Sequence, residues 1–282
     1  MEYHIQPLPR PYLMLLAIDI GNTNIVLGLF RDEHLVLQWR LSADTSRSVD
    51  EYRAILQTLA TAAGLDLPAQ TRALVLASVV PPLTTTFAAL ARQWLRIEPL
   101  IVHVGLRLGL NVRVREPARV GVDRLVNAVA GKTLYGSPCI TLDLGTATKF
   151  DVVDARGDFI GGAIAPGLQT ATEALVSRTA LLPRIDFAAP PSPIGEDTVR
   201  AMQAGIVLGY LSLVEGLASR IRARLGSETV PLIATGGLAP LIVPHTRVID
   251  IHDPDLTLKG LRIVHGLNAP SPPSDSQPPR NL

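Results

Sequence analysis

The fold is decided by one stretch near the beginning of the chain, Leu15-Leu16-Ala17-Ile18-Asp19-Ile20-Gly21-Asn22-Thr23-Asn24. An apolar run ends there in a carboxylate, a glycine and small polar residues, and a second apolar run, 25–30, follows at once. Two apolar runs joined by so short a polar segment predict two buried strands connected by a tight turn. Taken alone, the pattern is equally that of an ordinary hairpin loop without a ligand.

The same pattern returns in the second half of the chain, over residues 139–151. There the apolar run reaches Asp143, and Gly145 and three hydroxyl or small residues precede a second apolar run. One recurrence at such long spacing indicates two copies of a folding unit, since a solenoid repeats over a much shorter period. Two such turns facing each other would form a cleft with a carboxylate and several N–H and O–H donors on each side, which suits phosphate groups.

Composition narrows the class of protein. The 282 residues are 47% hydrophobic and 18% charged, which is typical of a globular enzyme, and the net charge is +1. So small a charge gives no reason to expect nucleic acid or a membrane surface as a partner. No apolar run approaches the roughly 20 residues that span a bilayer. The single cysteine, Cys139, suits a reducing compartment, so the sequence predicts a cytoplasmic protein.

The predicted elements follow the same order in both halves. After the first hairpin we expect strands at 34–41, 73–80 and 100–104, with helices at 48–64, 81–95 and 121–136. The second half is expected to hold strands at 138–142, 150–153, 159–164, 232–234 and 248–251, with helices at 168–177, 197–225 and 256–267 and a short one after 238. This order resembles the duplicated ribonuclease-H-like unit of the actin-like ATPases. The resemblance implies an α/β fold of two domains around a nucleotide cleft.

Four segments follow from this division. Residues 1–12 form an N-terminal extension that lacks the long apolar core of a signal peptide. The two ribonuclease-H-like domains are expected at 13–136 and 137–268. The remaining tail, 269–282, is rich in proline and serine, which predicts disorder.

An ordered set of motifs resembles type III pantothenate kinases, the bacterial enzymes that begin coenzyme A synthesis. The motifs are residues 19–24, 78–83, 121–124, 143–148, 161–167, 198–205 and 235–238. Each is weak alone, but together they span nearly all of 13–267, and Gly121-Val122-Asp123-Arg124 separates this family from related sugar and acetate kinases. The resemblance implies phosphorylation of the primary alcohol of pantothenate by ATP.

The resemblance also implies which residues bind ATP. The phosphates are expected at the first turn, on Asp19, Ile20, Gly21, Asn22, Thr23, Asn24, Ile25 and Val26, with Thr146 as a second contact. Asp19 is expected to hold Mg²⁺ through water, and the glycine pair at 236–237 to lie beside adenosine. Some relatives carry a lysine at the position of Val26, so in this chain metal ions and backbone N–H groups must meet the phosphate charge.

The pantothenate site is expected at the start of the predicted helix 121–136. The resemblance makes Asp123 the catalytic base and assigns substrate contacts to Gly121, Val122, Asp123, Arg124 and Thr198. A planar guanidinium such as that of Arg124 suits the pantothenate carboxylate. The alternatives are that Asp123 caps its helix or pairs with Arg124, that Arg124 forms a surface salt bridge, and that Thr198 caps the next long helix.

A cation is expected at the second turn. Asp143 resembles the family's ligand for a monovalent cation, K⁺ or NH₄⁺, although a carboxylate there could instead bind Mg²⁺. Lys149 stands where many relatives have threonine. It either reaches the phosphates or is simply solvated, and this departure from the family pattern leaves the cation requirement open.

The helix expected at 197–225 carries Gly205 and Gly209 on one face, so another element can approach it closely. We predict a homodimer interface there, with Thr198 reaching the substrate from the partner subunit; close packing within one subunit is the alternative. Two other functions fit the fold class: a non-catalytic regulatory protein and a related phosphatase or sugar kinase. Neither predicts the intact 121–124 motif beside both turns.

Overall fold

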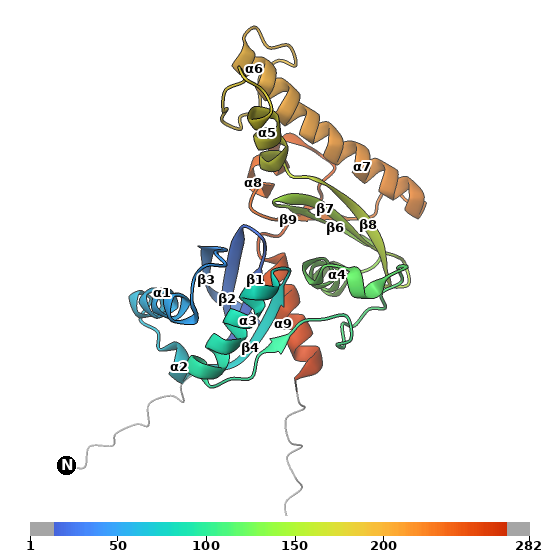
Figure 1. Cartoon of the computed structure of the whole chain (residues 1–282). Coiled ribbons are helices and arrows are strands. Elements are labelled where there is room, and N and C mark those ends of the chain that lie inside the picture. Colours follow the sequence, from blue (N-terminus) through green and yellow to red (C-terminus); the bar gives the residue numbers. More distant parts are fainter. Residues whose placement is uncertain (1–13, 270–282) are drawn as a thin grey trace, which may run out of the picture.

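The computed structural model describes residues 14–269. The predicted N-terminal extension and all but the first residue of the predicted tail lie outside the described residues. Two sheets lie one above the other in Figure 1, each covered by helices, with two helices between them.

The first sheet forms around the opening stretch of the sequence. Its five strands, in the spatial order β3-β2-β1-β4-β5, are β1 Met14–Ile20, β2 Asn24–Arg31, β3 His34–Ser42, β4 Thr71–Ser78 and β5 Leu100–Ile101. The β1–β2 pair is antiparallel and β1–β4 is parallel. The predicted hairpin is therefore confirmed.

The second sheet repeats this arrangement. Its strands, in the order β10-β9-β6-β7-β8, are β6 Cys139–Leu144, β7 Ala147–Val153, β8 Phe159–Pro166, β9 Leu232–Thr235 and β10 Ile251–His252. The β6–β7 pair is antiparallel and β6–β9 is parallel. Read from the other edge, the order is that of the first sheet, so the α/β fold with a duplicated ribonuclease-H-like unit is confirmed.

Helices occupy the connections between strands. They are α1 Val49–Ala62, α2 Leu67–Gln70, α3 Pro81–Leu90, α4 Val122–Tyr135, α5 Leu168–Ser177, α6 Thr198–Gln203, α7 Gly209–Leu225, α8 Ala239–Ile242 and α9 Leu256–Asn268. A capping box begins α1, because Glu51 Oε2 accepts the Ser48 N–H at 2.7 Å and Ser48 Oγ accepts the Glu51 N–H. A π-helical turn at 204–208 joins α6 to α7, so the predicted long helix runs almost unbroken.

Several predicted strands have different bounds in the structure, and two of them contain only two residues. The strand expected at 100–104 ends at Ile101, and two residues later His103 Nδ1 accepts the Gly105 N–H in a turn. The strand expected at 248–251 begins only at Ile251. Just before it, the Asp250 N–H donates to the Leu232 carbonyl of β9, while Arg222 donates to the Val248 carbonyl and to the Asp250 carboxylate.

The helices α4 and α9 form the layer between the sheets. They pack on each other, and each lies against the sheet formed by the other half of the chain. Helix α4 lies against β6 and β7, and α9 lies against β1 and β4. The two backbones come close at Gly260, where a Cβ would lie 2.4 Å from the Val126 carbonyl oxygen. Thr257 also donates to Asn127 across the pair at 2.8 Å. The two halves are thus joined through helices that cross between them.

Strand alternation decides which residues face this central layer. In β1, Leu16, Ile18 and Ile20 belong to the core cluster beneath α1 and α3, whereas Ala17 belongs to the cluster formed with α4 and α9. In β6, Leu142 faces the core beneath α7 and Cys139 faces the central layer. Because side chains alternate along a strand, the carboxylates that follow at the two strand ends also face the central layer.

Among the described residues, one helix has the length and composition expected of a membrane span. The segment Thr198–Leu225 has 28 residues and a mean hydropathy of 1.4 in its most apolar window, of which 39% is buried. Its buried side chains, including Tyr210, Leu211 and Val214, pack in the core of the second sheet. A partly buried core helix of this kind satisfies such a test, so the finding is weak evidence for a membrane.

Candidate functional site

The two turns predicted to bind phosphate meet each other. In the first turn the Gly21 N–H donates to the Asn24 carbonyl at 2.9 Å, and in the second the Gly145 N–H donates to Ala147 at 3.3 Å. The tips touch through the side chains of Thr23 and Thr146, whose Oγ1 atoms are 2.9 Å apart. Residues from both halves of the chain therefore meet here, and we call the region around Thr23 and Thr146 the gap.

The carboxylates converge at the same gap. Lys149 Nζ lies 2.7 Å from Asp143 Oδ2 and 2.6 Å from Asp123 Oδ2, which joins the second turn to the start of α4. The Asp143 and Lys149 backbones are direct partners in the antiparallel β6–β7 pair. All three side chains are between 16% and 18% exposed, so a ligand can reach them although the site is largely shielded from water.

Asp19 belongs to this cluster. Burial and then the negative charges of Asp123 and Asp143 raise the pKa of Asp19 to about 7, and the positive charges of Lys149 and Arg40 oppose the rise. Within residues 14–269 the Asp19 carboxylate accepts no hydrogen bond. It is therefore an oxygen ligand whose ionised form a bound cation would stabilise.

The donors in this gap fit Mg²⁺ held together with a nucleotide. In the described part of the chain no group of three or more His, Cys, Asp or Glu residues could hold a metal ion. Mg²⁺, however, commonly takes only one or two carboxylates and completes its shell with phosphate oxygens and water. Asp19 supplies such a carboxylate directly beside the turn that would hold the phosphates.

The start of α4 places Asp123 at the gap. Gly121 is the N-cap residue, so Asp123 does not cap the helix; its Oδ1 accepts the Arg124 N–H at 2.9 Å. A Cβ at position 121 would lie 2.6 Å from Asp123 Oδ1, so a larger residue there would displace the carboxylate. Val122 is the first residue of the helix and packs against the central core cluster.

Arg124 has a partner that the sequence analysis missed. Its Nε donates to Asp151 Oδ1 at 2.6 Å, and its guanidinium carbon lies 5.7 Å from the centre of the Phe159 ring. Asp151 is 1% exposed, and burial raises the pKa of its carboxyl to about 7 although Arg124 opposes the rise. The sequence feature that could have revealed this partner is the carboxylate of Asp151 within the apolar run 150–153. Since only Nε is engaged, the two Nη groups can still receive a ligand carboxylate.

The other residues expected to bind ATP differ in what they can offer. Asn22 and Thr23 are exposed at the turn, whereas the Ile20 and Ile25 side chains are fully buried in the core and leave only backbone groups for a ligand. Val26 packs on the central cluster. The nucleotide contacts expected at these last three positions would therefore be backbone contacts.

Glycines bring the backbone close to the carboxylates. Gly236 has φ +95° and a Cβ there would lie 2.6 Å from Asp143 Oδ1, so no side chain can be accommodated. A Cβ at the next residue, Gly237, would lie 3.8 Å from Arg40 Nη1, which places Arg40 of β3 beside the expected adenosine position. Arg40 was not predicted, because a single arginine in an alternating strand gives no distinguishing signal.

Thr198 lies apart from the residues above. It is exposed at the start of α6, and Figure 1 shows this helix at the far end of the molecule from α4. The N-cap is Asp197, whose carboxylate accepts the Arg200 N–H at 2.8 Å, so Thr198 is not a cap. Nothing lies within 4 Å of a Cβ at Gly205 or Gly209, so close packing within this subunit does not explain those glycines.

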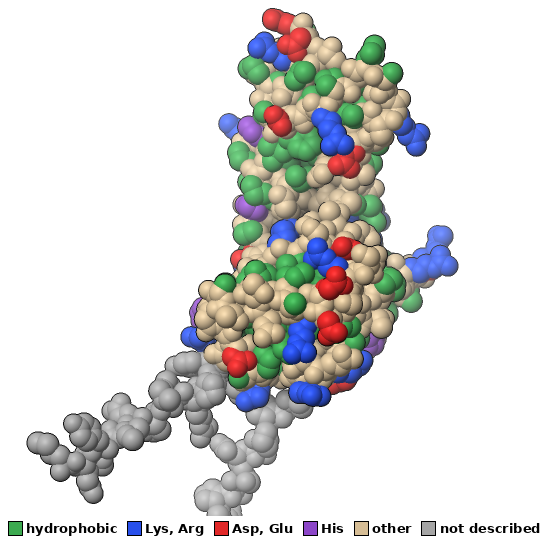
Figure 2. All heavy atoms as spheres, turned by 60° about the vertical axis from the view of Figure 1, so that its left-hand side comes forward, with side chains coloured by type: hydrophobic (Ala, Val, Ile, Leu, Met, Phe, Trp, Pro, Cys, Tyr) green, Lys and Arg blue, Asp and Glu red, His purple; other side chains and the backbone are tan. Residues whose placement is uncertain are grey.

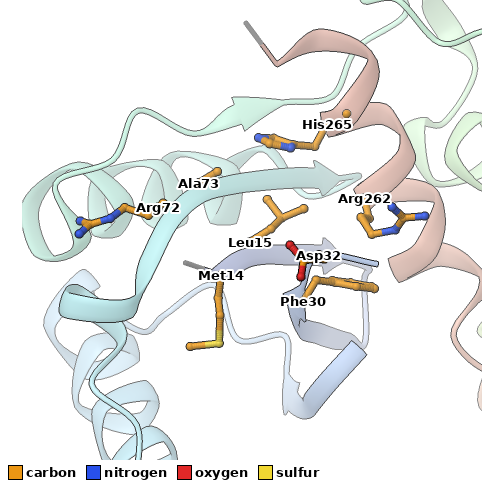
Figure 3. Close-up of a pocket in the computed structure, with 9 residues that line it drawn as sticks. Met14, Leu15, Phe30, Asp32, Arg72, Ala73, Arg262 and His265 are labelled. Atoms are coloured by element: carbon orange, nitrogen blue, oxygen red, sulfur yellow. The ribbon is translucent and has the colours of Figure 1, made fainter. Parts of the chain in front are cut away.

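A separate cavity of about 300 Å³ opens at the other end of β1. Figure 3 shows it between Met14, Arg72 of β4 and the α9 residues Arg262 and His265. Met14 and Asp19 are at opposite ends of β1. The cavity is therefore remote from the carboxylate cluster and adds nothing to it.

The chain is similar in sequence to one family of known proteins. The sequence model of the type III pantothenate kinase family matches residues 15–220. Three type III pantothenate kinases are similar over 90% of this chain: that of Moorella thermoacetica is 48% identical over its whole length, that of Geobacter sulfurreducens 47% over 99%, and that of Dehalococcoides mccartyi 45% over 98%.

Two solved structures share the fold at low sequence identity. A Campylobacter jejuni protein described as a Baf family transcriptional activator is 17% identical with a TM-score of 0.57, covering 89% of this chain and 97% of its own. A Sinorhizobium meliloti protein described as a 2-dehydro-3-deoxygalactonokinase is 15% identical with a TM-score of 0.56, covering 93% and 100%. The fold is thus found in sugar kinases too, and the sequence matches decide among its families: this chain belongs to the type III pantothenate kinases.

Proposed function

We propose that this chain transfers the γ-phosphoryl group of ATP to the primary alcohol of pantothenate, giving 4'-phosphopantothenate for coenzyme A biosynthesis. The observation that carries the proposal is the convergence of Asp19, Asp123 and Asp143 at the gap where Thr23 and Thr146 meet. Phosphoryl transfer depends mainly on alignment and on charge stabilisation. A gap with donors on two walls and carboxylates from three elements offers both.

ATP would bind with its phosphates between the two turns. The Thr23 and Thr146 hydroxyls and the backbone N–H groups of the first turn are the donors, and Asp19 would hold Mg²⁺, which neutralises charge on the phosphates when it is bound. The positive φ of Gly236 keeps the wall opposite Asp143 free of side chains, as a nucleotide lying there requires.

Asp123 is the proposed catalytic base. Its Oδ2 contacts Lys149 and its Oδ1 accepts the Arg124 N–H, which fixes the carboxylate plane while each oxygen keeps a lone pair for the substrate hydroxyl. Arg124 is the proposed contact for the pantothenate carboxylate. Its bond to buried Asp151 through Nε would aim the two Nη groups at that carboxylate. Gly121 and Val122 would shape the wall between the two ends of the substrate.

A homodimer is the proposed assembly. Large hydrophobic side chains are exposed around α5 and α6: Leu181 is 91% exposed, Ile194 79% and Ile164 62%. Figure 2 shows hydrophobic side chains on the upper part of the molecule, where these helices lie. Gly205 and Gly209 leave room for a second helix to approach α6 and the π turn. Thr198 would then complete the substrate site of the partner subunit.

We propose a cytoplasmic enzyme with no nucleic-acid or membrane partner, consistent with its net charge of +1. We keep 13–136 and 137–268 as the two domains, with α4 and α9 packed across the division. Lys149 already lies against Asp143, the carboxylate that is expected to bind a monovalent cation.

The test is a direct assay. Purified protein is incubated with Mg²⁺, ATP and pantothenate, and phosphopantothenate and ADP are measured by mass spectrometry. We expect the two products in equal amounts and neither from Asp123→Asn above a small residue. No product under any cation condition would favour the non-catalytic regulatory function, and ADP without phosphopantothenate would mean that water or another alcohol is the phosphoryl acceptor.

A further inference from the structure

The side chain of Lys149 ends between two of the three carboxylates in the site. Its ammonium group donates to Asp123 Oδ2 at 2.6 Å and lies 2.7 Å from Asp143 Oδ2. Lys149 and Asp143 are direct partners across β6 and β7, so their side chains lie on one face of the sheet. The strand register therefore fixes a positive charge at this point.

The contact between Lys149 and Asp143 affects whether a K⁺ or NH₄⁺ ion can bind at Asp143. An ammonium group is itself a monovalent cation, and this one already lies against the carboxylate expected to bind the ion. A second cation on the same oxygen would be repelled by Nζ at close range. The residues present thus do not fit a separate monovalent cation at Asp143.

The lysine is held firmly as a cation. A lysine side chain is an ammonium cation at neutral pH, and the Asp123 and Asp143 carboxylates at 2.6 and 2.7 Å from Nζ stabilise that charge. An ammonium group has three donors, and the two carboxylates take two of them. The third can meet a phosphate oxygen in the gap.

We propose that Lys149 replaces the monovalent cation in this enzyme, so that phosphoryl transfer needs Mg²⁺ but no added K⁺ or NH₄⁺. Lys149 is a positioning residue: it fixes the Asp123 carboxylate and supplies one positive charge next to Asp143. The inference rests on the proposed function, since the charge matters only if the gap holds phosphates.

The test compares cation dependence in three variants. Turnover is measured with Mg²⁺–ATP and pantothenate in tetramethylammonium chloride, and KCl or NH₄Cl then replaces that salt at constant ionic strength. We expect the wild-type kcat to change less than about twofold, because its cation is covalently attached. Lys149→Thr, which restores the residue of many relatives, should lose at least about tenfold without K⁺ and recover with it. Lys149→Met, with neither charge nor oxygen, should lose as much and not recover.

A matched control separates this effect from general damage. Lys259 of α9 also pairs with a buried carboxylate, at 2.7 Å from Asp253 Oδ1, and serves no role in the site. Lys259→Thr should lower the melting temperature without making turnover depend on K⁺. Circular dichroism of every variant confirms that it is folded.

A binding measurement supplies a readout that does not depend on turnover. The melting temperature of nucleotide-free protein is recorded in KCl and in tetramethylammonium chloride. K⁺ should raise it for Lys149→Thr and leave the wild type unchanged. The inference is overturned by a wild-type kcat that K⁺ raises tenfold, by an unimpaired Lys149→Thr, or by K⁺-specific stabilisation of the wild type. A wild type inactive in every salt would contradict the proposed function, and the melting temperatures would still decide the role of Lys149.

Discussion

Thr23 and Thr146 hydrogen-bond to each other across the two halves of the chain, with 2.9 Å between their Oγ1 atoms. Each hydroxyl sits at the tip of a turn that follows a buried strand ending in a carboxylate, Asp19 in β1 and Asp143 in β6. This contact joins the two turns that we propose to hold the ATP phosphates, and the first prediction concerns its two hydroxyls.

Thr23→Val and Thr146→Val should each weaken ATP binding, because each removes one donor to a charged phosphate. A hydrogen bond to a charged group contributes about 1.5–3 kcal/mol, which corresponds to a rise in the KM for ATP of about tenfold or more. The double variant should lose less than the sum, since the two hydroxyls act on neighbouring oxygens. Steady-state kinetics against ATP measures this. Thr58→Val on the exposed side of α1 is the control; a strictly additive double variant would place the two hydroxyls at independent sites.

Asp123→Asn should fold and bind ATP but lose about 10²–10⁴-fold in kcat, because the amide cannot accept the proton of the substrate hydroxyl. The KM for ATP should change little. Asp50→Asn, exposed in the first turn of α1, is the matched control and should keep wild-type turnover. Unchanged kcat in Asp123→Asn would remove this residue from the role of base.

Arg124→Lys should raise the KM for pantothenate at least about tenfold with a smaller change in kcat. Lysine keeps the charge but cannot contact Asp151 and a carboxylate as a planar fork does. An alcohol analogue of pantothenate without the carboxylate provides the control: the wild type should bind it poorly, and Arg124→Lys should discriminate less between the two. If both enzymes show the same preference, Arg124 does not read the carboxylate.

The stability of the nucleotide-free protein should depend on the titration of Asp19. Its pKa is about 7 in the fold, against an ordinary value of 3.8 when unfolded. Between about pH 4 and pH 7 the folded state therefore holds a proton that the unfolded state has lost, so this residue makes the free energy of unfolding fall as pH rises. Above pH 7 the loss is complete, at up to about 4 kcal/mol for three pKa units.

Asp19→Asn removes that titration. The variant should be more stable than the wild type at pH 8, and the difference should vanish near pH 4. Urea unfolding in EDTA at both pH values measures it, and Asp50→Asn should show no such pH-dependent difference. Equal stability gains at both pH values would mean that the gain does not come from the Asp19 charge.

Much of the fold follows from local sequence, and the pairing across the site does not. The apolar runs on either side of the Asp19 and Asp143 turns predict both hairpins, and a one-residue shift in pairing would turn the carboxylates toward the wrong core. The bond between Arg124 and Asp151 joins a helix to a strand, and no spacing within the sequence reports it. Lys149 was singled out because many relatives have threonine there. Its contacts with Asp123 and Asp143 were not predicted, because these residues belong to separate elements, α4 and β6.

The helices α4 and α9 show the same limit at the level of the whole fold. The sequence predicts where α4 and α9 begin and end, since each has an apolar stripe and a clear boundary. It does not predict that α9 packs on the first sheet and α4 on the second. The packing of α4 on α9 depends on the small residue Gly260. The sequence does not show why glycine is needed there, because the constraint is the close approach of Val126 from the other helix.

Gly260→Ala tests this crossing. The new Cβ would lie 2.4 Å from the Val126 carbonyl oxygen and 2.7 Å from its Cγ1, and backbone cannot yield as a flexible side chain does. Overpacking of this kind costs typically about 1–3 kcal/mol, so the free energy of unfolding should fall by that amount. Gly266→Ala is the matched control on the same helix: nothing lies within 4 Å of its Cβ, so the better helix propensity of alanine should leave stability equal or higher. Chemical denaturation of both variants measures the two free energies of unfolding. A Gly260→Ala protein as stable as Gly266→Ala would mean that α4 and α9 can move apart without cost.

Since these two helices connect the sheets that carry Asp19 and Asp143, Gly260→Ala should also lower kcat more than its loss of stability explains.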